Sequence, residues 1–206
     1  MGTMMIVNGS PRAPRSNSKR YGEIFAHFWG EDVDEYSVTT RKHQEACREI
    51  ENHDHLLLVF PLYVDSLPVT LMELMKKMEN YPFQKRPAIH VLINCGFLEP
   101  EQNLVALDIV RLFCKEQGFP FGMALCIGSG EAILSTPFSF FVKRKIRRLA
   151  RGIHLGKSEV LKVTMPISKK MFLSASTSYW LRRGEKNGID LNQMSTMEIE
   201  SNTTLE

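Results

Sequence analysis

The chain has 206 residues, a formal net charge of +3, 43% hydrophobic residues and 24% charged residues. This length and composition are typical of one globular domain with at most an appended tail. No apolar run approaches the roughly 18 residues that a membrane-spanning helix needs, so we expect no integral membrane segment. We also find no secretory signal peptide. Four scattered cysteines are expected to be reduced thiols, and the protein is predicted to be cytoplasmic.

Five apolar segments of strand length alternate with helical patterns. The predicted strands are residues 4–7, 33–38, 56–60, 89–93 and 123–127. Between the first two, apolar residues from Tyr21 to Trp29 recur with the spacing of one buried helix face, and later patterns predict further helices. Continuous apolar runs favour parallel strands covered on both faces. The alternation therefore predicts an α/β fold, with ligands beyond the carboxyl ends of the strands.

A polar loop at residues 8–18 separates the first strand from the first helix. We interpret it as a phosphate-binding turn, because a helix N-terminus offers free N–H groups and partial positive charge. Short hydroxyl and amide side chains and two arginines surround this point: Ser10, Arg12, Arg15, Ser16, Asn17 and Ser18. The alternative is an ordinary loop in which Asn17 or Ser18 caps the helix.

The loops after the third and fourth strands, residues 61–68 and 94–103, each carry an aromatic residue beside Gly or Pro. Tyr63 and Phe97 have chemistry suited to holding a flat ring. Alternatively, they cover the end of the sheet.

These loops resemble a known family. The motifs G-S-P-R (9–12), S-N-S (16–18), P-L-Y-V-D-S-L-P (61–68) and N-C-G-F-x-E-x-x-Q-N (94–103) are similar to those of flavodoxin-like NAD(P)H-dependent FMN reductases and quinone reductases. The resemblance covers residues 4 to about 130. It implies a flavodoxin-like three-layer sandwich with a five-stranded parallel sheet in the order 2-1-3-4-5 and helices on both faces. Two departures are Ser18, where many relatives have Thr, and Arg15-Ser16, where several have a glycine.

The resemblance also implies a cofactor site. Ser10, Arg12, Ser16, Asn17 and Ser18 would hold the FMN phosphate, and the second and third loops would bracket the isoalloxazine ring. The residues implied for those two loops are Pro61, Leu62, Tyr63, Val64, Asn94, Cys95, Gly96, Phe97, Glu99 and Asn103. We expect no catalytic side chain and no metal site, because the flavin would carry the chemistry.

Two functions fit this resemblance. The first is an enzyme that transfers hydride from NADH or NADPH through FMN to a small acceptor: a quinone, an azo or nitro compound, or a free flavin. The second is a flavodoxin-type one-electron carrier without NAD(P)H activity. By resemblance such carriers are strongly acidic, so the net charge of +3 favours the enzyme. A domain that keeps the fold without binding flavin is a third alternative.

The C-terminal part is predicted to be different in character. Residues 137–156 predict a cationic amphipathic helix, with six Lys and Arg residues between Lys143 and Arg151. It is either a solvated outer face, a surface for an acidic partner or membrane, or an attractor of nucleotide phosphate. We expect a domain over residues 1–156 and an extension over 157–206 that packs on it or across a homodimer around Tyr179 and Trp180, fraying after about residue 191. No nucleic-acid partner is expected.

Overall fold

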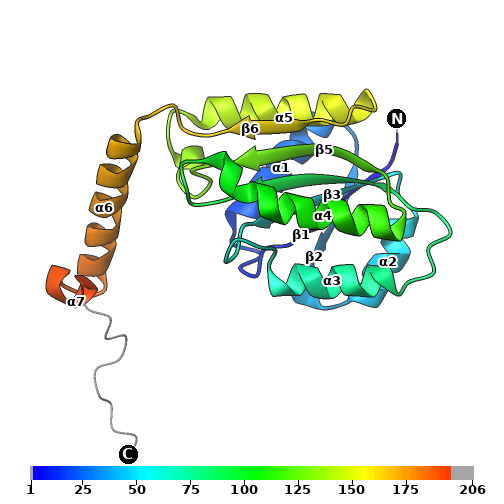
Figure 1. The fold of residues 1–206 in the computed structure, drawn as a ribbon, viewed down its shortest axis with the longest axis horizontal. Coiled ribbons are helices and arrows are strands. Elements are labelled where there is room, and N and C mark those ends of the chain that lie inside the picture. The colour runs from blue at the N-terminus through cyan, green and yellow to red at the C-terminus, as the bar shows by residue number, and fades with distance from the viewer. Residues whose placement is uncertain (1, 196–206) are drawn as a thin grey trace, which may run out of the picture. The chain divides into compact units, whose positions relative to one another are not determined.

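The computed structural model describes residues 2–195 and divides into two compact units, one ending at Met165 and the other beginning at Pro166 (Figure 1). Residues 196–206, the last part of the segment predicted to fray, lie outside the described residues. Within residues 2–195, no helix is both long enough and apolar enough to cross a membrane.

The first unit is built on one parallel sheet in the order β2-β1-β3-β4-β5-β6. The strands are β1 (Met4–Asn8), β2 (Val33–Ser37), β3 (His55–Pro61), β4 (Ala88–Asn94), β5 (Phe121–Ile127) and β6 (Val160–Val163). The central strands β3, β4 and β5 are buried almost throughout, which explains their continuous apolar sequences. The predicted order 2-1-3-4-5 is confirmed for the first five strands.

The prediction of five strands was one short. β6 pairs in parallel with β5, although its residues fall in the predicted extension. It is only four residues long, and exposed Lys162 separates buried Leu161 from buried Val163, so it has no continuous apolar run. The sheet unit therefore reaches Met165 rather than ending at residue 156.

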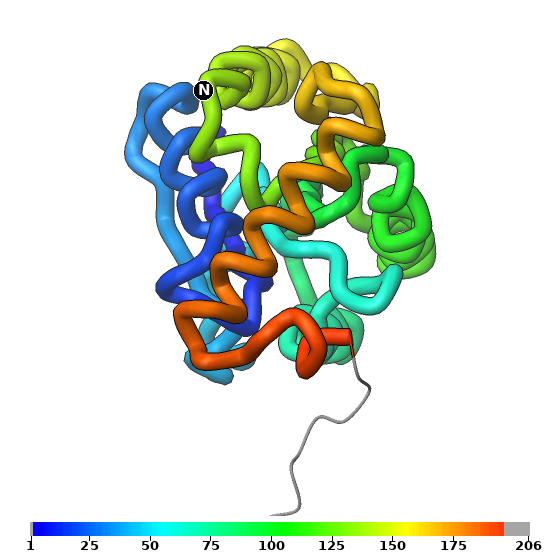
Figure 2. Tube along the Cα trace, turned by 90° about the vertical axis from the view of Figure 1, so that its left-hand side faces the viewer, coloured from blue at the N-terminus to red at the C-terminus, as the bar shows by residue number. Residues whose placement is uncertain are grey.

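Helices cover both faces of the sheet. α1 (Asn17–Trp29) and α5 (Ser139–His154) lie on one face, and α2 (His43–Glu51), α3 (Val69–Glu79) and α4 (Leu104–Gln117) lie on the other. In the end-on view of Figure 2, α1 (blue) and α5 (yellow-green) lie on the side opposite α3 (teal) and α4 (green). The predicted three-layer sandwich is therefore confirmed.

The second unit contains α6 (Lys169–Lys186) and α7 (Leu191–Ser195). The Ser168 hydroxyl caps α6 by accepting a hydrogen bond from the Met171 N–H at 3.2 Å. Gly184 is the one buried residue of α6 and packs against Met194. Large apolar side chains of this unit, including Tyr179 and Trp180, are exposed.

A buried histidine lies in the sheet of the first unit. His90 of β4 is 3% exposed, and its Nδ1 accepts a hydrogen bond from the Met123 N–H at 3.0 Å. Its Nε2 lies 3.2 Å from Nδ1 of His55. Burial, with a smaller contribution from His55, lowers the pKa of His90 to about 3. The ring is therefore neutral in the folded protein at physiological pH.

We predict that this histidine makes stability depend on pH. An unfolded histidine titrates near 6.5, so between that pH and about 3 the unfolded chain binds a proton that the folded chain does not. Acidification from about pH 7 to pH 5 should therefore lower the free energy of unfolding by about 2 kcal/mol through His90. Urea denaturation at both pH values measures this. In His90→Gln, whose amide oxygen can still accept the Met123 N–H bond, the decrease should be smaller; an unchanged decrease would contradict the assignment.

Candidate functional site

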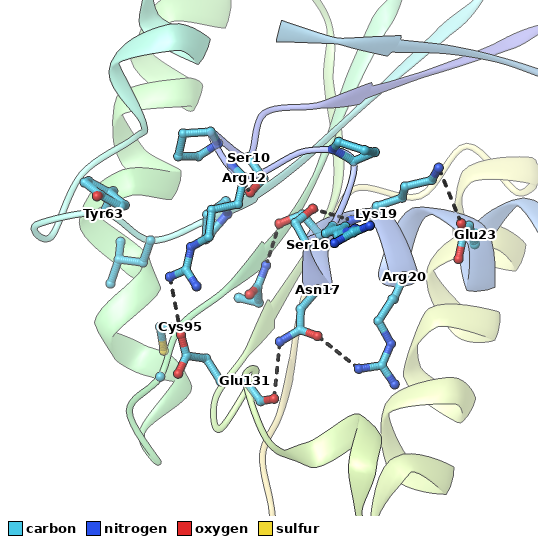
Figure 3. Close-up of a pocket in the computed structure, with 18 residues that line it drawn as sticks. Ser10, Arg12, Ser16, Asn17, Lys19, Arg20, Glu23, Tyr63, Cys95 and Glu131 are labelled. Carbon is cyan, nitrogen blue, oxygen red and sulfur yellow. Dashed lines mark hydrogen bonds and ion pairs between the residues drawn. The ribbon is translucent and has the colours of Figure 1, made fainter. Parts of the chain in front are cut away.

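A pocket of about 520 Å³ opens at the carboxyl ends of β1, β3 and β4 (Figure 3). The loop after β1 and the first turns of α1 form one side. Residues 61–63 and 94–96 form another, and Glu131 from the segment after β5 completes the lining. The volume is within the roughly 300–1,000 Å³ typical of small-molecule sites. The pocket lies at the edge of the sheet where the fold predicts a ligand.

The N-terminus of α1 lies in the wall of this pocket. Ser16 is the N-cap: its backbone is extended, and its Oγ accepts a hydrogen bond from the Lys19 N–H at 3.1 Å. The alternative of Asn17 or Ser18 as the cap is thus wrong. The N–H groups of Asn17 and Ser18, at the first two positions of α1, have no acceptor within the helix. With the helix dipole, they make this point suited to an anion.

Ser18 links the helix to the sheet. It is 1% exposed, and its Oγ accepts a hydrogen bond from Nδ2 of Asn94 at 3.1 Å. The same amide donates to the Phe60 carbonyl at 3.1 Å. Asn94 therefore ties the start of α1 to the ends of β3 and β4, while the Ser18 hydroxyl proton remains available to donate.

Charged side chains of both signs surround the pocket. Its lining includes four cations and two carboxylates, namely Arg12, Arg15, Lys19, Arg20, Glu23 and Glu131. Figure 3 shows Arg12 directed toward Glu131, with 3.9 Å between Nη2 and Oε1. Both side chains are largely exposed, so the pair adds little stability. A phosphate can replace the carboxylate at Arg12 at low cost.

The segment after β3 makes a tight turn at Tyr63. The Tyr63 N–H donates to the Ser66 carbonyl at 2.9 Å, and the Ser66 N–H donates to the Tyr63 carbonyl at 3.0 Å. Between them, Val64 and Asp65 have φ values of 48° and 56°. Two consecutive left-handed residues are the signature of a type I′ turn, which prefers Asn and Gly. A β-branched residue there is strained, and Val64 is 89% exposed, so packing does not compensate.

We therefore predict that Val64→Asn raises the free energy of unfolding by about 1 kcal/mol, because asparagine tolerates positive φ. The difference is measured by urea denaturation. Val105→Asn is the matched control, since Val105 is also exposed but lies in α4. That control should give no gain. A Val64→Asn variant no more stable than the parent would show that the turn relaxes at no cost.

The segment after β4 is held from within. Asn103 is fully buried, and its Nδ2 donates to the Pro100 carbonyl at 3.0 Å and to Sγ of Cys95 at 3.4 Å. Burial raises the pKa of the Cys95 thiol, which therefore stays protonated at neutral pH. Phe97 is 52% exposed at the tip of the segment. Among the described residues, no group of three His, Cys, Asp or Glu side chains is placed to hold a metal ion.

The structure brings most of the predicted site residues together. Those that line the pocket are Ser10, Arg12, Ser16, Asn17, Ser18, Pro61, Leu62, Tyr63, Asn94, Cys95 and Gly96. Val64, Phe97, Glu99 and Asn103 do not line it. In this conformation Asn103 supports the loop and is not accessible to a ligand.

Seven lining residues are absent from the set implied for the cofactor site: Pro11, Pro14, Arg15, Lys19, Arg20, Glu23 and Glu131. The sequence does indicate a place for Glu131 in the site, because Glu131 follows β5 and the carboxyl ends of parallel strands meet at one edge of the sheet. Its backbone carbonyl accepts a hydrogen bond from Nδ2 of Asn17 at 3.2 Å, which joins the two segments.

No family profile matches the chain, and no curated protein matches it. Solved structures are similar. An FMN-dependent NADH-azoreductase from Bacillus anthracis in complex with FMN has 10% identity and a TM-score of 0.60, over 73% of this chain and 99% of that one. An NAD(P)H:quinone oxidoreductase from Methanothermobacter marburgensis has 13% identity and a TM-score of 0.57, over 74% of this chain and 96% of that one. A flavodoxin from Fusobacterium nucleatum bound to flavin mononucleotide has 17% identity and a TM-score of 0.55, over 75% of this chain and 98% of that one. The chain therefore has the flavodoxin-like fold.

Proposed function

We propose that this chain is an FMN-dependent oxidoreductase that passes hydride from NADH or NADPH through bound FMN to a small acceptor, such as a quinone, an azo or nitro compound, or a free flavin. The observation that carries the proposal is the pocket, whose lining combines the N-terminus of α1, short donors, four cations and Tyr63. Similar structures include an FMN-dependent NADH-azoreductase and an NAD(P)H:quinone oxidoreductase, which supports this choice.

The donor set fits a phosphate group. Ser10, Ser16 and Ser18 offer hydroxyls, and the N–H groups of Asn17 and Ser18 complete an anion-binding arrangement. Arg12 would exchange its contact with Glu131 for a stronger, charge-assisted bond to phosphate. The phosphate end of FMN would thus be held by residues from one loop and one helix start.

The chain would position the cofactor, and FMN, when bound, supplies the hydride-accepting ring. Tyr63 is 52% exposed and lines the pocket, so its ring is available for stacking. The Cys95 thiol is neutral and hydrogen-bonded within its loop, so it is not a nucleophile here. Activity is therefore expected to depend little on the protonation of protein groups.

The deciding experiment is an absorption spectrum of the purified protein with FMN, before and after anaerobic addition of NADH or NADPH. Binding at micromolar FMN and loss of the yellow colour with either nicotinamide are expected. A protein that binds no FMN would reject the proposal. FMN binding without reduction by either nicotinamide would indicate the one-electron carrier instead. Initial rates should give parallel double-reciprocal lines, because both substrates would use the same open side of the pocket.

We also propose that the protein is a cytoplasmic homodimer. All four cysteines are free and buried, which suits a reducing compartment. Exposed apolar side chains in the second unit, such as Met171, Tyr179 and Trp180, favour association with a second copy. Light scattering at tens of micromolar should give twice the chain mass of 23.6 kDa. Tyr179→Ser with Trp180→Ser should shift the mass toward the monomer; a monomeric parent protein would contradict the proposal.

A further inference from the structure

Helix α5 accounts for the excess of positive charge in this protein. It carries six Lys and Arg residues and no carboxylate. Within residues 2–195, only Arg148 of these six forms an ion pair, with Glu159 at 3.0 Å. The chain has 26 Lys and Arg residues against 23 Asp and Glu, so the remaining twenty cations are outnumbered by the carboxylates. The excess of positive charge therefore comes from one helix.

The outward side of α5 combines arginine with exposed apolar residues. Phe140, Arg144, Arg147, Arg151 and Leu155 succeed one another at intervals of three or four residues, so they follow one line along the helix. All five are exposed, with Phe140 at 62% and Leu155 at 58%. We call this set the arginine stripe. It faces away from the sheet, since the buried residues of α5 occupy the opposite side.

The arginine stripe is separate from the candidate site. No residue of α5 lines the pocket, so the stripe does not serve the phosphate position there. At about 1.5 Å per residue, it extends for roughly 22 Å. It lies along the outside of the first unit, where α5 covers β5 and β6 (Figure 1). A long, straight, exposed line of this kind suits an extended surface better than a small ligand.

The side chains of the stripe indicate which surface. Guanidinium groups bind phosphate through paired hydrogen bonds. Phe140 and Leu155, at the two ends, gain free energy when they enter hydrocarbon. Phosphate beside hydrocarbon on one flat face is the chemistry of a phospholipid bilayer, whereas a nucleic acid offers phosphate without hydrocarbon. We propose that the arginine stripe docks this protein on a membrane rich in anionic phospholipid, with α5 parallel to the surface.

Sedimentation of the full chain with lipid vesicles tests the proposal. Vesicles of phosphatidylglycerol mixed with phosphatidylcholine should bind the protein, and vesicles of phosphatidylcholine alone should not. Binding should weaken as salt is added, because counterions screen charges at the surface. Equal binding to both kinds of vesicle, or no binding to either, would overturn the proposal. So would tight binding to a short DNA duplex without binding to anionic vesicles.

Matched variants locate the surface. Arg144→Gln, Arg147→Gln and Arg151→Gln together should weaken vesicle binding by about a hundredfold, given the contribution of each cation near an anionic membrane. The control removes the same charge from α2 and α3 on the opposite face of the sheet, with Arg48→Gln, Lys76→Gln and Lys77→Gln. It should bind nearly as well as the parent.

Equal losses in the two triple variants would show a diffuse charge effect and overturn the proposal. Phe140→Ser alone should also weaken binding, including in high salt, where apolar insertion dominates. This single variant keeps every arginine, so it tests the stripe even if the triple variant fails to fold. Unchanged binding by Phe140→Ser would show that the helix does not insert.

Discussion

Alanine at Ser16 and at Ser18 is expected to weaken FMN binding by about 10-fold to 150-fold per residue, because each lost hydrogen bond to a charged group contributes roughly 1.5–3 kcal/mol. Riboflavin lacks the phosphate, so its binding should change much less. Fluorescence titration of each variant with both flavins gives the ratio of the two effects. Equal weakening of both ligands would show that the serines serve only the protein.

This comparison needs a control because Ser16 also caps α1 and Ser18 also accepts a bond from Asn94. Removing a cap costs about 1 kcal/mol of stability by itself. Ser168→Ala is the matched variant, since Ser168 caps α6 in the same way and does not line the pocket. It should leave the ratio of FMN to riboflavin affinity unchanged. Ser16→Thr, which keeps the hydroxyl, should retain most of the FMN preference.

Alanine at Gly128 is expected to destabilise the protein by about 3 kcal/mol, because the added methyl group meets backbone that cannot move independently. A Cβ at this position would clash with the Leu98 carbonyl and lie 3.0 Å from the Pro100 nitrogen and 2.9 Å from Oγ1 of Thr164. The displaced backbone belongs to the segment that carries Gly96 into the pocket, so FMN affinity should fall as well. Urea denaturation and FMN titration measure the two effects.

Gly22→Ala is the control for this substitution. Gly22 is also buried, but it lies within α1, and a Cβ there would make only an ordinary contact of 3.5 Å with Ile6. Alanine is the better helix former, so this variant should gain about 0.5–1 kcal/mol. If Gly128→Ala were as stable as the parent, the loops after β4 and β5 would not be interlocked as the structure shows.

The parts of the fold that could be predicted are those whose residues form a continuous local pattern in the sequence. The central strands β3, β4 and β5 are apolar along almost their whole length because both faces of the sheet are covered. These apolar runs allowed the central strands to be predicted from the sequence. The site followed from topology, since segments after parallel strands meet at one edge. Most of the residues predicted for the site, among them Ser16, Tyr63 and Asn94, therefore line the pocket.

What could not be predicted depends on contacts between distant segments. β6 shows no apolar run because one of its sides is exposed, and its pairing with β5 appears only in three dimensions. Asn103 belongs to a motif expected to contact the cofactor. In the structure, its Nδ2 instead donates hydrogen bonds to the Pro100 carbonyl and to Sγ of Cys95. The strained turn at Val64 opposes local propensity, and such conflicts between residue and backbone gather at functional sites.

The sheet ends at β2 on one side and at β6 on the other. A free edge strand exposes backbone groups that can recruit another chain and begin aggregation. Here, β2 carries exposed Asp34 and Glu35, and β6 is four residues long with exposed Lys162. Charge on both edges, and shortness on one, disfavour growth by strand addition. The protein should therefore stay dispersed at high concentration, and any ordered association should occur through its helices rather than by extension of the sheet into fibrils.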